Sequence, residues 1–478
     1  MQCLDDGSIV LRFALCPGHA QARLHPHLHL LTVWYRLMTS STMPYERKVL
    51  PLPRPPSRCS GDSMHAPSPD LLARLTDTLR DNTDRLIELR RYLHTHPELS
   101  QHEFETTAHM VARVEELGFE TFVRPEGTGF YADLTPANFD PTLHPTVAIR
   151  SDIDALPIEE LNDIPYKSQN PGVMHACGHD VHMATVFGSG LSLRELKDQL
   201  PGRLRLIFQH AEETVPGGAT EMVDFGAIDH VDAILGLHCD PERPIGEIGV
   251  RPGPFTASFD LFEIHIEGKG GHGARPHQCT DPIFVATQVA NALYQLPAHN
   301  FDARIPAVIT LGTFQAGIAA NVIPETASLS GSIRTISPEH RDQLDDLLRR
   351  TIGGICLAHG ASYELKLIRG APAIHNDAYI TSVIADVATD ILGDDGAQHI
   401  PLPSMGGEDF SVYCERIPGA MFRLGTGAQA PRNFLHSPHF NIDERAINVG
   451  ASILARAALR LLHEKAIEKK TDRMVQPL

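Results

Sequence analysis

A thiol and an imidazole stand two residues apart in the segment Met174-His175-Ala176-Cys177-Gly178-His179-Asp180-Val181-His182. At this spacing a thiolate and an imidazole can bind the same metal ion. Further along the chain, Glu212 and Glu213 form a pair of adjacent carboxylates. Because adjacent side chains point in different directions, one carboxylate can bind metal while its neighbour transfers protons. The two motifs together indicate metal-dependent hydrolysis.

Three short apolar runs with the pattern of buried strands end in residues that bind metals. The runs are 146–150, 204–208 and 233–237, and after them come Asp152 and Asp154, Glu212 and Glu213, and His238. Residues past the carboxyl ends of strands in an α/β sheet line the ligand crevice. Taken singly, such aspartates are also typical helix caps, and His238 is typical of a structural histidine. A shared site explains the repetition better, because unpaired carboxylates and imidazoles in a core are costly.

Length and composition fit a soluble enzyme. The 478 residues, 42% of them hydrophobic, suffice for a large core. Length suggests about three domain-sized units, with a discontinuous two-domain chain as the alternative. The 41 basic and 59 acidic side chains give a net charge of −18, which argues against nucleic acid or an anionic membrane as the principal partner. Eight scattered cysteines favour a reducing compartment, so we expect a cytoplasmic protein.

Residues 1–66 differ from the rest of the chain. They contain His and Pro clusters, and an apolar patch at 30–35 is too short to span a bilayer. The order of charged and apolar residues is not that of a signal peptide, and Asp5 and Asp6 count against an amphipathic targeting segment. We therefore expect a disordered extension, or a translation start at Met64.

From residue 67 the pattern becomes regular. Leucines between 71 and 93 are spaced as the buried stripe of one or two helices. Ser100 and Glu103 predict a capping box for a further helix, and Gly118 predicts where that helix stops.

The middle of the chain changes to alternating strands and two longer helices, which predicts an inserted α+β domain. A helix is expected over 442–464. The expected organisation is an extension at 1–66, a catalytic domain at 67–251 and 372–466, an inserted domain at 252–371 and a tail at 467–478.

Residues 71–462 resemble the aminoacylase and carboxypeptidase family of two-metal metallopeptidases. The segments that carry the resemblance are 96–100, 151–157, 175–182, 211–213, 270–277, 321–324, 404–410 and 436–439. The Cys-x-His element of Cys177 and His179 favours the branch of hippurate hydrolases, N-acyl-amino-acid amidohydrolases and auxin-conjugate hydrolases over the dipeptidases. One departure is His210, because the family usually has Pro before Ala-Glu-Glu.

The resemblance implies an α/β fold with two domains, a mixed-sheet catalytic domain and an inserted α+β lid and dimerisation domain. It implies two divalent ions, with Zn, Mn, Co and Ni all open, and Glu212 as the general base. The implied metal ligands are Cys177, His179, Glu213, His238 and His436.

Similarity also assigns residues around the substrate in an expected homodimer. His272 would contact the oxyanion, from the same subunit or its partner, and Asn321 and Arg334 would bind the carboxylate side of the substrate. A guanidinium can pair with a carboxylate through two hydrogen bonds, and a surface ion pair is the alternative for Arg334. Asp152, Asp154 and Glu408 are expected to support the ligands.

The implied reaction is hydrolysis of the amide bond of N-acyl amino acids such as hippurate. The nearest alternative is a dipeptidase or carboxypeptidase of the same family. A non-catalytic binding protein on this fold is expected to have lost the base or a ligand, and neither is missing. A structural zinc protein using Cys177, His179, His182 and Cys239 is disfavoured, because closed structural sites rarely recruit carboxylates.

Overall fold

The computed structural model describes residues 2–3, 9–10, 67–427 and 434–475. Within the first fifty residues it describes only the short antiparallel pair β1 (Gln2–Cys3) and β2 (Ile9–Val10). The expected N-terminal extension and the start at Met64 therefore lie almost wholly outside the described residues. No helix in the described part of the chain is both long and apolar enough to cross a membrane.

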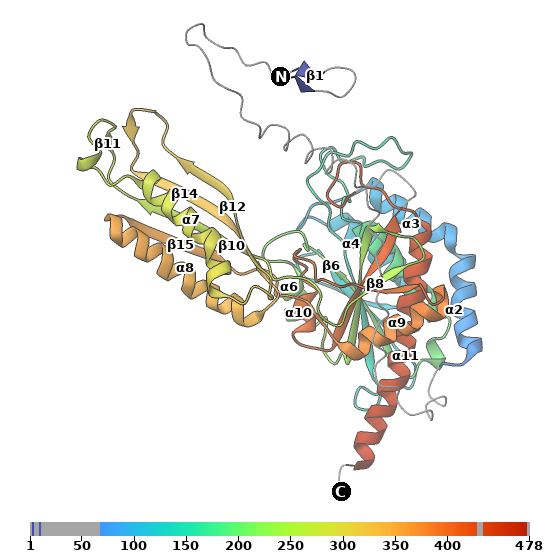
Figure 1. Cartoon of the computed structure of the whole chain (residues 1–478). Coiled ribbons are helices and arrows are strands. Elements are labelled where there is room, and N and C mark those ends of the chain that lie inside the picture. The colour runs from blue at the N-terminus through green and yellow to red at the C-terminus, as the bar shows by residue number, and fades with distance from the viewer. Residues whose placement is uncertain (1, 4–8, 11–66, 428–433, 476–478) are drawn as a thin grey trace, which may run out of the picture. The chain divides into compact units, whose positions relative to one another are not determined.

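The central element is an eight-stranded mixed sheet with the order β17-β8-β18-β7-β5-β6-β4-β3 (Figure 1). Its strands are β3 (Glu120–Val123), β4 (Phe130–Leu134), β5 (Thr146–Asp152), β6 (Arg203–Gln209), β7 (Ala233–Pro244), β8 (Ile248–Val250), β17 (Ala397–His399) and β18 (Gly419–Gly427). β6, β5, β7 and β18 are parallel neighbours, whereas β4 and β8 pair antiparallel with β6 and β18. The parallel centre brings the carboxyl ends of four strands to one edge.

Helices cover both faces of this sheet, and the side-chain alternation of β5 shows how. Val147 and Ile149 pack into one hydrophobic core, and Ala148 packs into the core on the opposite face. The larger core includes residues of α2 (Pro69–Asp81), α3 (Thr83–Thr95), α4 (Phe104–Glu115), α5 (His179–Arg194), α9 (Ala378–Leu392) and α11 (Arg445–Val475). The smaller core includes residues of α6 (Ala219–Asp224) and α10 (Ser411–Cys414).

Helix α5 is buried on every side from His179 to Leu193. Two glycines allow this close packing, because a Cβ on Gly188 would lie 3.0 Å from Leu86, and one on Gly190 would lie 2.7 Å from Leu206. A helix enclosed in this way holds its first residue, His179, in a fixed place.

A second, antiparallel sheet has the order β12-β14-β10-β15. It consists of β10 (Asp260–Glu267), β12 (Ala307–Ala316), β14 (Thr326–Thr335) and β15 (Ser362–Ile368). Phe262, Ile264 and Ile266 alternate with more exposed residues and pack in a separate core against α7 (Pro282–Asn300) and α8 (Pro338–His359). Two small pairs accompany it, β11 (Gly271–His272) with β13 (Val322–Ile323), and β9 (Gly253–Pro254) with β16 (His375–Asn376).

The predicted α/β class with a mixed sheet is confirmed. The last helix starts at Arg445 and runs to Val475, eleven residues beyond its expected end at 464. The predicted capping box is wrong, because α4 begins at Phe104 and Glu103 is itself the N-cap residue without a side-chain cap. Ser100 instead donates to Asp154 (2.7 Å), and Glu103 accepts the N–H of Ala211 (2.8 Å). Both side chains therefore contact segments of the candidate site.

Candidate metal centre

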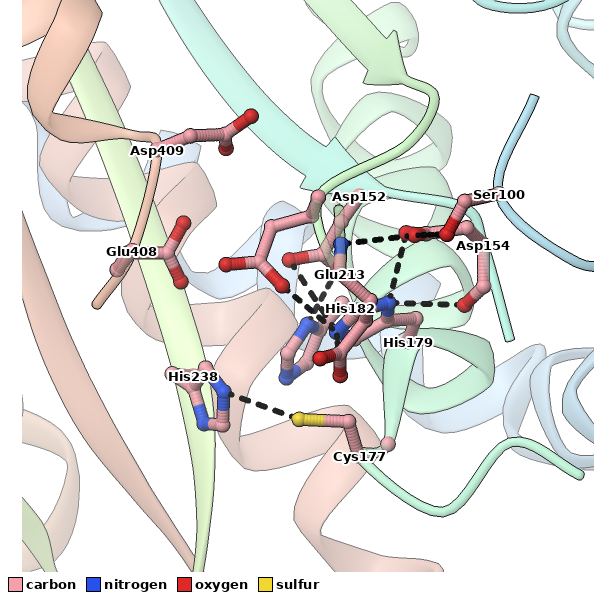
Figure 2. A network of polar contacts seen from close by, with 12 residues as sticks. Ser100, Asp152, Asp154, Cys177, His179, His182, Glu213, His238, Glu408 and Asp409 are labelled. Carbon is pink, nitrogen blue, oxygen red and sulfur yellow. Dashed lines mark hydrogen bonds and ion pairs between the residues drawn. The ribbon is translucent and has the colours of Figure 1, made fainter. Parts of the chain in front are cut away.

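The expected ligands meet at the carboxyl edge of the parallel strands (Figure 2). His179 is the first residue of α5, and Cys177 lies two residues before it. Glu213 follows β6, and His238 lies in β7. His436 lies in the loop between β18 and α11 and has a left-handed backbone (φ 61°). The sheet and its buried helix thus bring together five side chains that are up to 259 positions apart in the chain.

One ring nitrogen of His179 is oriented by Asp154. Nδ1 lies 2.9 Å from the carbonyl oxygen of Asp154 and 3.2 Å from its carboxylate, so Nδ1–H donates there. Nε2 is buried, has no hydrogen-bond partner, and lies 3.9 Å from Oε1 of Glu213. Asp154 also accepts the backbone N–H of Glu213 (2.9 Å). This carboxylate therefore links two expected ligands, as outer carboxylates commonly do at metal sites.

His238 and Cys177 face each other across the cluster (Figure 2). Nδ1 of His238 donates to the carbonyl oxygen of Cys239 (2.8 Å), and Nε2 lies 3.4 Å from Sγ of Cys177. Burial, with a further contribution from Arg423, lowers the pKa of His238, which keeps the imidazole neutral and able to ligate. Burial and the nearby carboxylates of Glu213 and Glu212 raise the pKa of the Cys177 thiol. A thiolate here therefore requires a cation beside it.

Among the described residues, five groups of side chains could hold a metal ion, and two of these groups share Cys177. One group is Cys177, His179 and His238, and the other is Cys177, Glu213 and His436, with all atoms of each group within 4.8 Å of one another. Oε1 of Glu213 is buried without a hydrogen bond, 3.2 Å from Nε2 of His436. A set of thiolate, imidazole and carboxylate ligands suits zinc and other transition metals. The residues present thus fit two adjacent ions.

His182 lies beside the cluster but both of its ring nitrogens are occupied. Nδ1 lies 2.6 Å from Asp152, and Nε2 accepts the backbone N–H of Cys239 (2.9 Å). Among the described residues no candidate metal group contains Cys239. The arrangement therefore does not favour a closed structural zinc site made of Cys177, His179, His182 and Cys239.

Arg150 neutralises the acidic side of the site. Its Nη1 lies 2.8 Å from Asp152 and 3.2 Å from Glu408, and its Nη2 lies 2.7 Å from Asp409. All four side chains are almost completely buried. This arginine therefore supports three carboxylates from two distant parts of the chain.

Replacing Arg150 by Met should lower the free energy of unfolding by about 3–5 kcal/mol, because removal of one partner leaves buried carboxylates uncompensated. Urea denaturation followed by circular dichroism measures the change. Arg80→Met is the matched control, since Arg80 pairs with Asp77 on the surface and its loss should change little. An Arg150 variant as stable as the control would contradict the role of Arg150 in stabilising the three buried carboxylates.

Four of the five expected ligands, Cys177, Glu213, His238 and His436, line a cavity of about 530 Å³. Glu212 also lines it, and burial, with Glu408 and Glu213 close by, raises the pKa of this carboxyl well above its ordinary value. A carboxylate in such a place readily takes up a proton. Arg334 reaches the cavity from β14, with its guanidinium 4.2 Å from the ring centre of Phe259 and donating to the carbonyl of Met405 (2.9 Å). The cavity therefore combines proton-transfer and anion-binding groups.

Two expected substrate residues are not brought into this cavity. His272 in β11 and Asn321 beside β13 are exposed, and neither is among the residues that line it. The departure at His210 is also outside it. His210 is buried 2.7 Å from Arg124 and 3.0 Å from Glu221, just before Ala211, whose φ is 51°. His210 thus packs behind the turn that carries the two glutamates.

Three further residues at the site were not predicted. Asp409 forms a potential metal group with Glu212 and Glu408, and its position next to Glu408 was the available signal. Arg150 could have been noticed as a charge inside an apolar strand. Arg423 lines the cavity from β18, and its position in the sequence carries no signal that would have identified it.

Comparisons with known proteins agree with this geometry. Residues 148–460 match the model of peptidase family M20/M25/M40. An N-acetyl-L-cysteine deacetylase of Bacillus subtilis is 39% identical over 81% of this chain and 91% of its own length. Thermostable carboxypeptidase 1 of Saccharolobus solfataricus is 37% identical over 82% of this chain and 98% of its own length. The crystal structure of the Bacillus subtilis YXEP protein, a dinuclear metal binding peptidase from the M20 family, has a TM-score of 0.69 at 36% identity and covers 80% of this chain and 99% of its own.

Proposed function

Because the chain belongs to peptidase family M20/M25/M40, a family of hydrolases acting on amide or peptide bonds, we propose that it cleaves the amide bond of N-acyl amino acids. The observation that carries the proposal is the pair of ligand groups that share Cys177, with the carboxyl of Glu212 lining the same cavity. The similarity to a deacetylase of an N-acyl amino acid supports this substrate class.

In the proposed reaction the five ligands Cys177, His179, Glu213, His238 and His436 hold two divalent ions. Bound there, the ions would polarise the amide carbonyl and make water more acidic. Glu212 takes the proton from the attacking water and passes it to the nitrogen of the leaving amino acid. This transfer is needed because an unprotonated amide nitrogen is a poor leaving group.

Arg334 is proposed to bind the α-carboxylate of the substrate, since its fork of N–H donors matches a carboxylate. His272 is proposed to stabilise the oxyanion, and Asn321 to bind the carboxylate side. Because both lie outside the cavity of their own chain, we propose that they enter the cavity of the partner subunit in a homodimer. A reducing, cytoplasmic location is proposed from the free cysteines 177, 239, 279, 356 and 414.

The proposed dimer predicts complementation between inactive subunits. When His272→Ala and Glu212→Gln proteins are dissociated and reassembled at equal amounts, activity should recover to about one quarter of the wild-type value, because half of the dimers carry one intact site. Each protein alone should stay inactive. Recovery is measured as amino-acid release, and a mixture that stays at the level of its components would show that His272 acts within its own chain or not at all.

A substrate panel tests the proposed function. The metal-free protein is reconstituted with Zn²⁺, Mn²⁺, Co²⁺ or Ni²⁺, and amino-acid release is measured from N-acetyl-, N-benzoyl- and indoleacetyl-amino acids and from dipeptides. We expect metal-restored cleavage of the acyl conjugates. Cleavage confined to dipeptides would instead assign a peptidase, in line with the similarity to a carboxypeptidase. No cleavage of any compound would favour a binding protein.

A further inference from the structure

Arg423 lies on β18 directly beside a proposed metal ligand. Its register partner on the parallel neighbour β7 is His238, so the two side chains lie on the same face of the sheet. Arg423 lines the cavity of the metal centre and also a second cavity of about 440 Å³. The two cavities share Ser404, Arg423 and Leu435, and therefore adjoin. The guanidinium thus lies at the passage from the proposed reaction centre into a side pocket.

This guanidinium has no hydrogen bond or ion pair with any described residue. Its Cζ lies 5.5 Å from the centre of the Phe255 ring. The other arginine of the side pocket, Arg243, is different, because it lies 3.3 Å from Asp240 and 3.8 Å from Glu247. Arg423 therefore offers five unused N–H donors to whatever enters the side pocket.

The remaining walls of the side pocket include a group of apolar side chains. They are Phe255, Ile400, Leu402, Phe434 and Leu435. Leu402 is 76% exposed and Phe434 is 57% exposed, so this apolar surface is available to a ligand. A short hydrocarbon segment would pack against these side chains, and a negatively charged group would pair with Arg423.

The main cavity is lined by several acidic side chains, so an anionic group that binds there needs an arginine such as Arg423 beside it. Glu212, Glu213, Glu408 and Asp409 all line that cavity. Arg334 and Arg423 are the two arginines that line it, one from each sheet. If Arg334 binds the α-carboxylate of the substrate, Arg423 remains for a second anionic group.

We infer that Arg423 and the apolar walls of the side pocket form a subsite for an acyl group that ends in a carboxylate. The preferred substrates are then N-acyl amino acids whose acyl part is a short dicarboxylic acid, such as succinyl or glutaryl. This inference rests on the proposed amidohydrolase function and specifies its acyl group. The scissile amide lies at the metal ligands, with one carboxylate on Arg334 and the other on Arg423.

The test compares acyl groups that match in length and differ in charge. kcat/KM is measured for N-succinyl against N-butyryl, and for N-glutaryl against N-pentanoyl, on one amino acid. The wild-type protein should prefer each anionic member by about 10- to 100-fold, mostly through KM, since the pairing is made in the ground state as well as in the transition state. Arg423→Gln should bring the ratio to about one, and Arg423→Lys should restore part of it.

Arg243→Gln is the matched control, because it removes an arginine of the same pocket that already has acidic partners, and it should keep the wild-type ratio. Metal content is measured for every variant, because Arg423 also contributes to the low pKa of His238. The ratio between two substrates is independent of the fraction of protein that carries metal. A variant that merely binds less metal therefore does not imitate the expected result.

A wild-type ratio near one, or a ratio that survives Arg423→Gln, would overturn the inference. An equal loss for anionic and neutral substrates would also overturn it, since Arg423 would then bind the common α-carboxylate. The proposed function fails separately, by absence of cleavage of every acyl compound. In that case calorimetric binding of N-succinyl against N-butyryl amino acid to wild-type and Arg423→Gln proteins still decides whether the subsite exists.

Discussion

Glu212→Gln should reduce kcat by about 10²–10⁴-fold, the usual contribution of general acid-base catalysis, and should leave the metal content unchanged. Gln has nearly the same shape as Glu but cannot accept the proton of water. Among the described residues, Glu212 belongs to potential metal groups with His179 and Glu213 and with Glu408 and Asp409, whereas Glu213 also belongs to a group with Cys177. Steady-state rates and metal analysis by plasma mass spectrometry measure the two quantities on the same preparation.

Glu195→Gln provides the control for this variant, because Glu195 is exposed and, within the described part of the chain, its carboxylate pairs with its neighbour Arg194 alone. It should keep both rate and metal. If Glu212→Gln retained near-normal turnover, Glu212 would not be the base. If it lost metal together with activity, Glu212 would be a ligand, and the division of roles between the two adjacent glutamates would be wrong.

Cys177→Ala should remove metal from the protein and abolish activity. The two groups proposed to hold the ions both contain Cys177, so its loss weakens both positions, whereas loss of His238 or His436 affects one position. Metal content after gel filtration should fall well below the wild-type value, and rates should fall with it. Cys239→Ala is the matched control, because Cys239 is also a buried thiol near the site but belongs to no candidate group among the described residues. Full metal occupancy of Cys177→Ala would exclude its thiol as a ligand.

The clustering of the ligands was largely predictable from the sequence. Glu213 closely follows β6, and His238 comes directly after the apolar run 233–237, although β7 itself continues to Pro244. Parallel strands place residues near their carboxyl ends at one edge of a sheet. Cys177 and His179 are close in sequence, and His179 is the first residue of the buried helix α5. His436 was expected from the resemblance alone, since its position depends on a loop with a left-handed backbone rather than on a strand end.

Other features depended on contacts between distant parts of the chain. Arg150 and Asp409 are 259 residues apart, and nothing near either residue indicates that they pair. The predicted capping box was wrong because Ser100 hydrogen-bonds to Asp154 and Glu103 hydrogen-bonds to Ala211, both distant in the sequence. Resemblance assigned His272 and Asn321 to the substrate, and one chain alone does not bring them to the cavity. The position of Arg423 beside His238 could be recognised only from the structure, in which β18 pairs with β7.

The central claim is that amide hydrolysis takes place at two ions held by the two ligand groups that share Cys177. It is tested most directly by titrating the metal-free protein with metal during turnover of an N-acyl amino acid. The account predicts negligible release of amino acid without metal and a rise that saturates at about two equivalents per chain. It also predicts no rise in Cys177→Ala. Full activity of the metal-free protein, or metal binding that restores no cleavage of any N-acyl amino acid, would contradict it.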